Sequence, residues 1–325
     1  MPGIEDSIEK HPPPEGLLSS VRLAPLTTMQ VGGRSRWFSE IRHLASLTKT
    51  YQWAKGQSLP IFFLGDGSNV LFSDLEFPGL VLRNRTSGKD RNGNQILVAG
   101  GENLGDLIRW TNQQQLSGME RMYGIPGTVA GALVGNAGAY GQEICESVIE
   151  TTVWSPDGAI RKLSRSQLEF GYRHSIFKGQ KDYFILDCTL SLKPSRKKLQ
   201  AISDSILETR LAKYPLGLKC PGSFFKNVLA AELSDQARRS IPIDFVQFGK
   251  IPAGKLLEAV GAKGARSGSA LFAKHHANLL VNEGNATSRD IMRLANKYAD
   301  RVRQRFHLSL EPEIFIVDDQ EWLQQ

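Results

Sequence analysis

Two patterns of hydrophobic and polar residues follow one another along the chain, and they change near residue 194. Before that point, short apolar runs bounded by Gly, Asp, Asn or Ser predict β-strands. We expect strands at 60–64, 79–83, 95–100, 150–155 and 183–192. Helical spacing is seen at Leu44, Leu47 and Tyr51, and again at Leu104, Leu107, Ile108 and Thr111. This half is therefore predicted to be α+β.

The second pattern is dominated by helices. A helix that ends at Pro215 is expected to place Leu199, Ile202, Ile206 and Leu207 on one face. Thr287 and Asp290 resemble a capping box, and the helix after them has the apolar stripe Ile291, Leu294, Ala295, Tyr298, Val302 and Phe306. Alternation then predicts a strand at 308–317, with Leu310, Pro312, Ile314 and Ile316 on one face and Glu311, Glu313 and Phe315 on the other.

Composition narrows the class of protein. The 325 residues, 41% hydrophobic and 22% charged, are typical of a globular chain with two or three domains. The net charge is +7, but the lysines and arginines are scattered among acidic residues and form no basic block, so we expect no nucleic-acid partner. A mildly basic surface suits anionic small molecules as well as it suits nucleic acid. Three cysteines without CxxC spacing indicate neither disulfides nor zinc, which favours a reducing cytoplasm.

Two stretches of the N-terminal half are candidates for targeting or membrane segments, and neither fits. The start, "MPGIEDSIEKHPPPEG", has acids and prolines where a signal peptide needs a basic start and an apolar run, so we expect a disordered lead-in. The stretch 122–142 is uncharged and contains the small-residue spacing of packed transmembrane helices. Its six glycines and its proline leave too few large apolar side chains for insertion.

Two glycine-rich stretches are candidates for binding a nucleotide. In "LGDGSNVLF" (64–72), glycines around a serine and an asparagine offer backbone N–H groups to a pyrophosphate, although a plain hairpin turn is the alternative. In "YGIPGTVAGALVGNAGAYG" (123–141), a glycine every three or four residues lets the backbone approach a flat ring, and tight helix–sheet packing is the alternative. Together the two stretches favour a bound dinucleotide.

Four polar residues are further candidates for binding or catalysis. Arg173 in "FGYRHSIFK" could bind a carboxylate with two hydrogen bonds, or pair with an acid of the chain. Ser223 in "CPGSFFKN" lacks the G-x-S-x-G elbow motif and the neighbouring histidine that accompany a nucleophilic serine. A role in a turn or as a helix cap would also explain it. For His275 and His276 a hydrogen-bonding role is favoured over zinc.

Six motifs occur in one order along the chain. They are "TTMQVGGRSRWF" (27–38), "FLGDGSNVLFSD" (63–74), "GIPGTVAGALVGNAGAYG" (124–141), "YRHSIFK" (172–178), "GSFFKN" (222–227) and "LEPEI" (310–314). In this order and spacing the chain resembles the UDP-N-acetylenolpyruvoylglucosamine reductases, flavoenzymes of bacterial peptidoglycan precursor synthesis. The resemblance covers about residues 20–317.

The resemblance implies an α+β architecture of two domains. A two-part FAD-binding domain of the PCMH (vanillyl-alcohol-oxidase-like) type at 20–205, with parts at 20–84 and 85–205, would follow the lead-in 1–19 and precede a smaller substrate-binding domain at 206–325. Non-covalent FAD, reduced by NADPH, would convert UDP-N-acetylenolpyruvoylglucosamine to UDP-N-acetylmuramate. We expect a cytoplasmic monomer that acts in cell-wall biogenesis.

The resemblance also implies roles for individual residues. Ser223 would give a proton to the substrate carbon, while Arg173 and Glu313 would hold the substrate carboxylate. FAD contacts would come from Gly65, Asp66, Gly67, Ser68, Asn69, Val70, Pro126, Gly127, Thr128, Asn136, Ala137 and Gly138. Substrate contacts would come from Tyr172, Lys226, Asn227 and His276, and no metal is expected.

The chain departs from the family pattern at two points, and there are two alternatives to the reductase function. Phe315 stands where the family often has arginine, and the interval from Arg173 to Ser223 leaves no room for the extra tyrosine loop of one family branch. A related FAD-dependent oxidase is one alternative, although no histidine lies in either glycine stretch to hold FAD covalently. A non-catalytic nucleotide-binding regulator is the other, and the intact set of Arg173, Ser223 and Glu313 argues against it.

Overall fold

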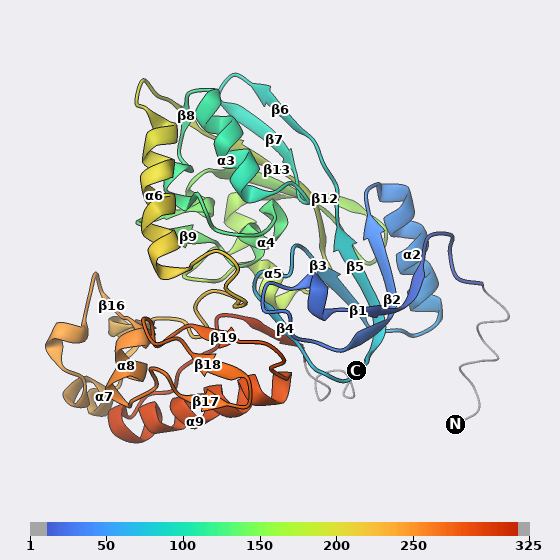
Figure 1. Cartoon of the computed structure of the whole chain (residues 1–325). Helices are drawn as coiled ribbons and strands as arrows, with labels where there is room; N and C mark the ends of the chain where they lie inside the picture. The colour runs from blue at the N-terminus through green and yellow to red at the C-terminus, as the bar shows by residue number, and fades with distance from the viewer. Residues whose placement is uncertain (1–11, 318–325) are drawn as a thin grey trace, which may run out of the picture. The chain divides into compact units, whose positions relative to one another are not determined.

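The computed structural model describes residues 12–317, which fold as two compact units (Figure 1). Within the described range, the first unit comprises residues 12–21, 35–66 and 77–212, and the second comprises 22–34, 67–76 and 213–317. The second unit therefore includes two segments from the N-terminal third of the chain. Prediction from sequence, which divides the chain into continuous domains, does not foresee this arrangement, and the bounds 20–84, 85–205 and 206–325 stay predictions.

The first sheet of the first unit is built around strand β5. Its order is β1 (Leu18–Arg22), β2 (Arg34–Ile41), β5 (Phe77–Asn84) and β3 (Ile61–Leu64). Both β2 and β3 run parallel to β5. Helix α2 (Leu44–Gly56) packs its buried Leu47 and Tyr51 against Leu80 and Leu82 of β5. Most of the predicted lead-in lies outside the described residues, and its last two residues belong to β1 rather than to a disordered end.

The second sheet of this unit is antiparallel. Its order is β12 (Ile160–Ser164), β11 (Val148–Trp154), β13 (Phe184–Ser191), β7 (Gln95–Ala99) and β6 (Lys89–Asn92). Its core includes residues of α3 (Leu104–Gln113) and α4 (Val129–Val134). The helices α5 (Ile176–Gly179) and α6 (Leu199–Lys213) follow, and the short strand pairs are β8 (Leu116–Ser117) with β14 (Lys193–Pro194) and β9 (Gly138–Ala139) with β10 (Gln142–Glu143).

The second unit surrounds a single long helix, α9 (Ser288–Phe306). Around it lie α7 (Asp235–Ser240), α8 (Ala253–Ala259) and the sheet β17 (Arg266–Ser267), β18 (Ala270–Phe272) and β19 (Leu280–Asn282). Two further strand pairs are β15 (Val228–Leu229) with β16 (Lys250–Ile251), and β4 (Val70–Phe72) with β20 (Phe315–Val317). The β4–β20 pair is parallel, and it joins the segment 67–76 of this unit to its last described residues.

Most of the predicted elements are confirmed, and the mixed helix and strand content confirms the α+β class. All six residues of the predicted stripe on α9 are buried, and Thr287 and Asp290 form the capping box. On α6, by contrast, Leu199 and Ser203 are the buried positions, and the other predicted apolar residues are only half-buried.

The predicted strand at 308–317 is wrong in its length. Pro312 forms an isolated antiparallel bridge with Phe225, and β20 begins only at Phe315, where it pairs in parallel with β4. Because proline has no N–H, it cannot continue a ladder, and the chain changes partner between these two positions. Leu310 and Ile314 are buried, but Pro312 is exposed.

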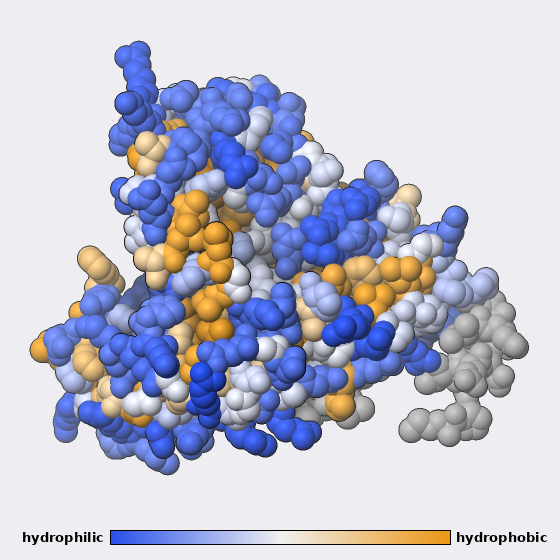
Figure 2. Space-filling view, in the orientation of Figure 1, coloured by the Kyte–Doolittle hydropathy of each residue, from blue (hydrophilic) through white to orange (hydrophobic). Residues whose placement is uncertain are grey.

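The surface of the molecule is mainly hydrophilic on the face that is drawn in Figure 2. Hydrophilic residues cover most of the face shown in Figure 2, and hydrophobic residues form smaller areas between them. The uncharged stretch 122–142 contains the short helix α4 and the β9–β10 pair instead of one long helix. Among the described residues, none of the helices combines the length and the apolar character needed to span a membrane.

Candidate active site

The two glycine-rich stretches of the sequence meet inside the first unit. Gly65 follows β3, and a Cβ atom added to it would lie 2.7 Å from Oγ1 of Thr128. That distance is shorter than side-chain contacts allow, so the contact requires glycine at position 65. Thr128 is itself the N-cap of α4, where its hydroxyl accepts a hydrogen bond from the Gly131 N–H at 3.2 Å.

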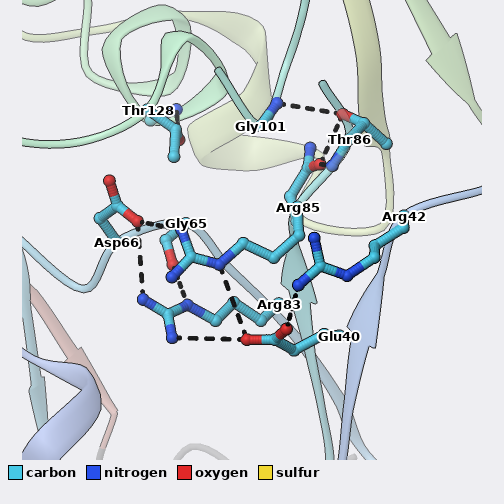
Figure 3. A network of polar contacts seen from close by, with 11 residues as sticks. Glu40, Arg42, Gly65, Asp66, Arg83, Arg85, Thr86, Gly101 and Thr128 are labelled. Atoms are coloured by element: carbon cyan, nitrogen blue, oxygen red, sulfur yellow. Dashed lines mark hydrogen bonds and ion pairs between the residues drawn. The ribbon is translucent and has the colours of Figure 1, made fainter. Parts of the chain in front are cut away.

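A cluster of charged side chains supports the first of these stretches (Figure 3). Arg85 donates from Nη1 to Oδ1 of Asp66 at 2.9 Å, and Arg83 donates from Nε to the Gly65 carbonyl at 3.3 Å. Oε1 of Glu40 lies 3.7 Å from Nη1 of Arg83 and 3.6 Å from Nε of Arg85. Burial, followed by the charge of Arg85, lowers the pKa of Arg83, and the two carboxylates oppose this shift.

The second stretch is tied by its backbone to the segment after β7. The N–H of Leu104 donates to the Gly127 carbonyl at 3.0 Å, and the N–H of Ala130 donates to the Gly100 carbonyl at 2.8 Å. Among residues 12–317, the N–H groups of Asp66 and Thr128 make no hydrogen bond to another residue. These two N–H groups are therefore available to an anionic ligand.

Asn136 has a structural role that the sequence did not reveal. Its side chain is 1% exposed and its φ is +42°. Nδ2 donates to Oε2 of Glu143 and to the Gly171 carbonyl, both at 2.9 Å, and Oδ1 accepts from the Cys145 N–H at 3.3 Å. The side-chain amide thus has partners within the protein, and whether Asn136 contacts FAD stays a prediction.

Other predicted cofactor residues lie close to Asn136 or Thr128 in sequence, with different exposure. Ala137 packs against the core of this unit, Gly127 is buried with φ of +123°, and Pro126 is exposed. Gly138 is too crowded for a side chain, because a Cβ would lie 2.6 Å from Cγ of Glu143. The second stretch is therefore closely packed, and whether these positions touch FAD stays a prediction.

Arg173 lies beside this second stretch. Its Nη2 donates to the Gly138 carbonyl at 3.0 Å, and its guanidinium is 5.4 Å from the centre of the Tyr172 ring. Its backbone has φ of +52° within a tight turn, in which Gly171 and His174 exchange two 3.1 Å hydrogen bonds. A non-glycine residue in this conformation needs support from its surroundings, and the turn supplies it.

The remainder of the first glycine loop belongs to the second unit. Gly67 has φ of +63°, and a Cβ there would lie 2.1 Å from the Leu26 carbonyl. The Thr28 side chain donates to the Ser68 carbonyl at 3.3 Å, and Val70 opens β4. Asn69 binds the backbone of Glu313 and of Phe315, since its Nδ2 donates to the Glu313 carbonyl at 3.1 Å and its own carbonyl accepts from the Phe315 N–H at 2.9 Å.

The structure brings together the segments of two predicted catalytic residues, Ser223 and Glu313. The N–H of Glu313 donates to the carbonyl of Phe224 at 2.8 Å, directly after Ser223. The next residues continue the pairing through the bridge between Phe225 and Pro312. Both predicted side chains are half-buried. Arg173, the third member of the set, lies in the first unit.

Asn278 fixes the Ser223 segment, and sequence analysis did not identify it. Its side chain is 2% exposed and binds both backbone groups of Phe225, accepting from the N–H at 2.9 Å and donating to the carbonyl at 2.8 Å. Its backbone carbonyl also accepts from the Phe224 N–H at 2.9 Å. The amide thus replaces a neighbouring strand. The only sequence signal is its position two residues after the histidine pair.

The predicted substrate residues of this unit already have partners in the protein. Lys226 forms an ion pair with Glu311 at 2.9 Å, and Oδ1 of Asn227 accepts from the Ala253 N–H at 3.1 Å. Nδ1 of His276 accepts from the Asn278 N–H at 3.2 Å. Burial, with the charges of Lys213 and His275, lowers the pKa of His276 to about 4, so its ring is neutral at pH 7.

The comparisons with known proteins agree with this arrangement. A family model described as "FAD binding domain" matches residues 38–164, and one described as "UDP-N-acetylenolpyruvoylglucosamine reductase, C-terminal domain" matches residues 214–317. The first match confirms the predicted FAD-binding domain type.

Individual relatives match nearly the whole chain. The UDP-N-acetylenolpyruvoylglucosamine reductase of Solibacter usitatus is 37% identical over 91% of this chain and 95% of its own length. That of Synechococcus sp. strain JA-3-3Ab is 35% identical over 92% and 90%. The crystal structure of the reductase from Thermus caldophilus aligns with a TM-score of 0.72 and 27% identity, and it covers 93% of this chain and 98% of that one. The chain belongs to the UDP-N-acetylenolpyruvoylglucosamine reductase family.

Proposed function

We propose that this chain reduces the enolpyruvyl ether of UDP-N-acetylglucosamine to the lactyl ether of UDP-N-acetylmuramate, with FAD as cofactor and NADPH as reductant. The observation that carries the proposal is the hydrogen bond between Glu313 and Phe224, which joins the segments of the predicted acid and the predicted proton donor. It occurs in a chain related to known reductases over nine-tenths of its length.

The residues of the first unit fit the diphosphate of FAD. Gly65 leaves no room for a side chain against Thr128, and the N–H groups of Asp66 and Thr128 make no hydrogen bond within residues 12–317. Backbone N–H groups of this kind suit phosphate oxygens. When bound, FAD supplies the hydride that it receives from the nicotinamide.

Ser223 supplies the proton in this proposal. Overall reduction adds a hydride to one alkene carbon and a proton to the other, which carries the ether oxygen and the carboxylate. A serine hydroxyl is a weak acid, but a carbon that develops negative charge is a strong base when the donor is held in place. The pairing of Phe224 and Phe225 with Glu313 and Asn278 holds the Ser223 backbone.

Arg173 and Glu313 are proposed to bind the substrate carboxylate. An arginine can donate two parallel hydrogen bonds to a carboxylate, and it stabilises the charge that spreads into that group during the reaction. Tyr172, Lys226, Asn227 and His276 are proposed to contact the remainder of the substrate. Phe315 stands where an arginine is common in the family, so the anion contact of that arginine is either missing here or supplied by another group.

Separate half-reactions test the proposal. The purified protein, reconstituted with FAD, should lose its yellow colour with NADPH in the absence of oxygen and recover it on addition of the enolpyruvyl sugar. Ser223→Ala should leave the first step unchanged and slow the second at least about 100-fold. Ser223→Cys, which retains an acidic proton, should recover part of the rate.

Three outcomes would count against this function. Recovery of colour by Ser223→Ala at the wild-type rate would reject the proton-donor role. A colourless protein that cannot be reconstituted would reject a flavoenzyme and leave a nucleotide-binding regulator. Fast reoxidation by air without the sugar would favour the oxidase alternative.

The cellular setting is part of the same proposal. We propose that the chain acts as a monomer in the cytoplasm and contributes to cell shape and division through peptidoglycan precursor synthesis. Sedimentation at micromolar concentration, with and without the UDP-sugar, would test the monomer.

A further inference from the structure

The end of strand β5 lies between the two glycine-rich stretches of the first unit. β5 is flanked by β2 and β3, and its ladder continues one residue past Asn84, since the Arg85 N–H donates to the Ile41 carbonyl at 2.8 Å. Successive side chains of an extended chain point to opposite sides. Arg83 and Arg85 should therefore share one side, with Asn84 and Thr86 on the other, and their contacts agree.

The arginine side of β5 fixes the first stretch. Arg83 binds the Gly65 carbonyl and Arg85 binds the Asp66 carboxylate (Figure 3). A peptide group is planar, and its C=O and N–H point in opposite directions. By holding the Gly65 carbonyl, Arg83 therefore sets the direction of the Asp66 N–H, one of the groups that make no hydrogen bond within residues 12–317.

The amide side of β5 fixes the second stretch. Asn84 is 4% exposed, and it donates to the Ile185 carbonyl at 2.8 Å and accepts from the Thr86 hydroxyl at 2.8 Å. The oxygen of that hydroxyl accepts from the Gly101 N–H at 3.0 Å. The segment that contains Gly101 is the one that binds the backbone of the second stretch.

The same planarity argument applies to the second stretch. The Leu104 N–H holds the Gly127 carbonyl, which shares a peptide plane with the Thr128 N–H. Asp66 and Thr128 thus have N–H directions set from the two sides of one strand end. The contact between Gly65 and Thr128 keeps these two peptides close together.

We propose that Arg83, Asn84, Arg85 and Thr86 are positioning residues, which align the N–H groups of Asp66 and Thr128 for a cofactor diphosphate. The proposal rests on the FAD-dependent function proposed above. It gives Asp66 a supporting role, in which the carboxylate anchors Arg85 and the backbone faces the ligand.

The cluster offers a matched control for this proposal. Arg42 pairs with the same Glu40 at 2.9 Å, but its side chain is 62% exposed and it bonds to neither Gly65 nor Asp66. The side chain of Arg83, by comparison, is 14% exposed. A loss that arises only from weakening the charge network around Glu40 would appear equally in Arg42→Gln.

The experiment compares Arg83→Gln, Arg85→Gln and Thr86→Val with Arg42→Gln in the full chain. FAD affinity would be measured from quenching of flavin fluorescence, and amide hydrogen exchange would be followed in FAD-free protein. We expect about tenfold weaker FAD binding for the first three variants, since each loses one hydrogen bond that orients the binding groups, and no change for Arg42→Gln.

Hydrogen exchange should separate the two sides of β5. Arg83→Gln and Arg85→Gln should speed exchange at residues 62–64, the end of β3 that pairs with β5 and leads into Gly65, without affecting residues 127–130, and Thr86→Val should affect residues 101–104 and 127–130 first. Arg85→Lys, which keeps one donor for Asp66, should recover part of the affinity. A purely structural role would not give this local pattern or this rescue.

Two results would overturn the inference. One is FAD binding by Arg83→Gln, Arg85→Gln and Thr86→Val as tight as that of Arg42→Gln, and the other is unchanged exchange at both stretches. Failure of the wild-type protein to bind FAD would reject the proposed function instead, and exchange in FAD-free protein would still decide the positioning role. If Arg83→Gln does not fold, Arg85→Gln and Thr86→Val carry the same test.

Discussion

The two units support their candidate site segments with different chemistry. In the first unit, the charged guanidinium groups of Arg83 and Arg85 bind the Gly65 carbonyl and the Asp66 carboxylate. The two arginine side chains are 14% and 31% exposed. In the second unit, the neutral amide of Asn278 holds the segment after Ser223 and is 2% exposed.

The difference follows from the free energy of removing each group from water. Burying a charge costs far more than burying an amide, so the arginines stay partly hydrated and share two carboxylates. An amide can be buried completely when all its hydrogen bonds are made. The first support should therefore respond to salt, and the second should be rigid and independent of salt.

The largest expected effect on stability comes from removing the Asn278 amide, which is the neutral support of the second unit. Asn278→Leu would leave the N–H and the carbonyl of Phe225 without their partners in a buried site, which should lower the free energy of unfolding by about 3 kcal/mol. Urea unfolding would measure it, and the rate of the sugar half-reaction should also fall. The control is Asn285→Leu, at an exposed position of the same unit.

An unchanged urea midpoint for Asn278→Leu would contradict the comparison. Asn278→Asp gives a finer test, because it keeps the acceptor for the Phe225 N–H and loses only the donor.

The neutral support should nevertheless depend on pH through His276, which accepts from the Asn278 N–H. The pKa of His276 is lowered to about 4 by burial and by Lys213, His275 and Lys263. The unfolded chain therefore binds a proton below about pH 6.5 that the folded protein does not bind until about pH 4. Stability from this group is complete above pH 6.5 and is lost as the pH falls toward 4.

The size of this pH effect should be on the order of 2 kcal/mol, and His276→Asn should remove it. Chemical unfolding at pH 7.5 and pH 4.5 would measure the difference between wild type and variant. His43→Asn, at an exposed position of the first unit, is the control. An equal pH slope in wild type and His276→Asn would show that the histidine does not contribute.

A smaller effect is expected from the charged support of the first unit. A double-mutant cycle of Arg85→Gln with Asp66→Asn should give a coupling of about 0.5–1 kcal/mol at low salt and less at 1 M NaCl. The same cycle between Arg42 and Asp66 should give none. A coupling that does not change with salt would remove the distinction between the two supports.

The smallest perturbation uses the native cysteines. Cys188 in the first unit is 0% exposed, and burial raises its pKa to about 12, whereas Cys220, three residues before Ser223, is 8% exposed. We expect Cys220 to react first in pulsed thiol labelling, because labelling requires local opening. Mass spectrometry of the labelled peptides would show the order, and earlier labelling of Cys188 would mean that the first unit opens more easily.

Elements whose signals are local could be predicted from the sequence alone. The stripe from Ile291 to Phe306 and the Thr287–Asp290 cap fixed helix α9, because a 3.6-residue period and an N-cap are complete within one segment. The six ordered motifs likewise indicated the family, because each of them is a short continuous segment of the chain. Confirmed strands such as β3 and β5 were recognisable from apolar runs and their glycine or polar ends.

The residues that hold these elements in place became apparent only from the folded chain. The tertiary structure limited the pairing at Pro312 to a single bridge with Phe225 and began the last strand only at Phe315, with β4 as its partner. It occupied the Asn136 amide with protein contacts, made Asp66 a partner of Arg85, and revealed the roles of Asn278 and the β5 end. The physical reason is that a hydrogen bond depends on a donor and an acceptor that meet in space. Partners as distant as Arg85 and Asp66, or Asn278 and Phe225, leave no periodic signal in the sequence.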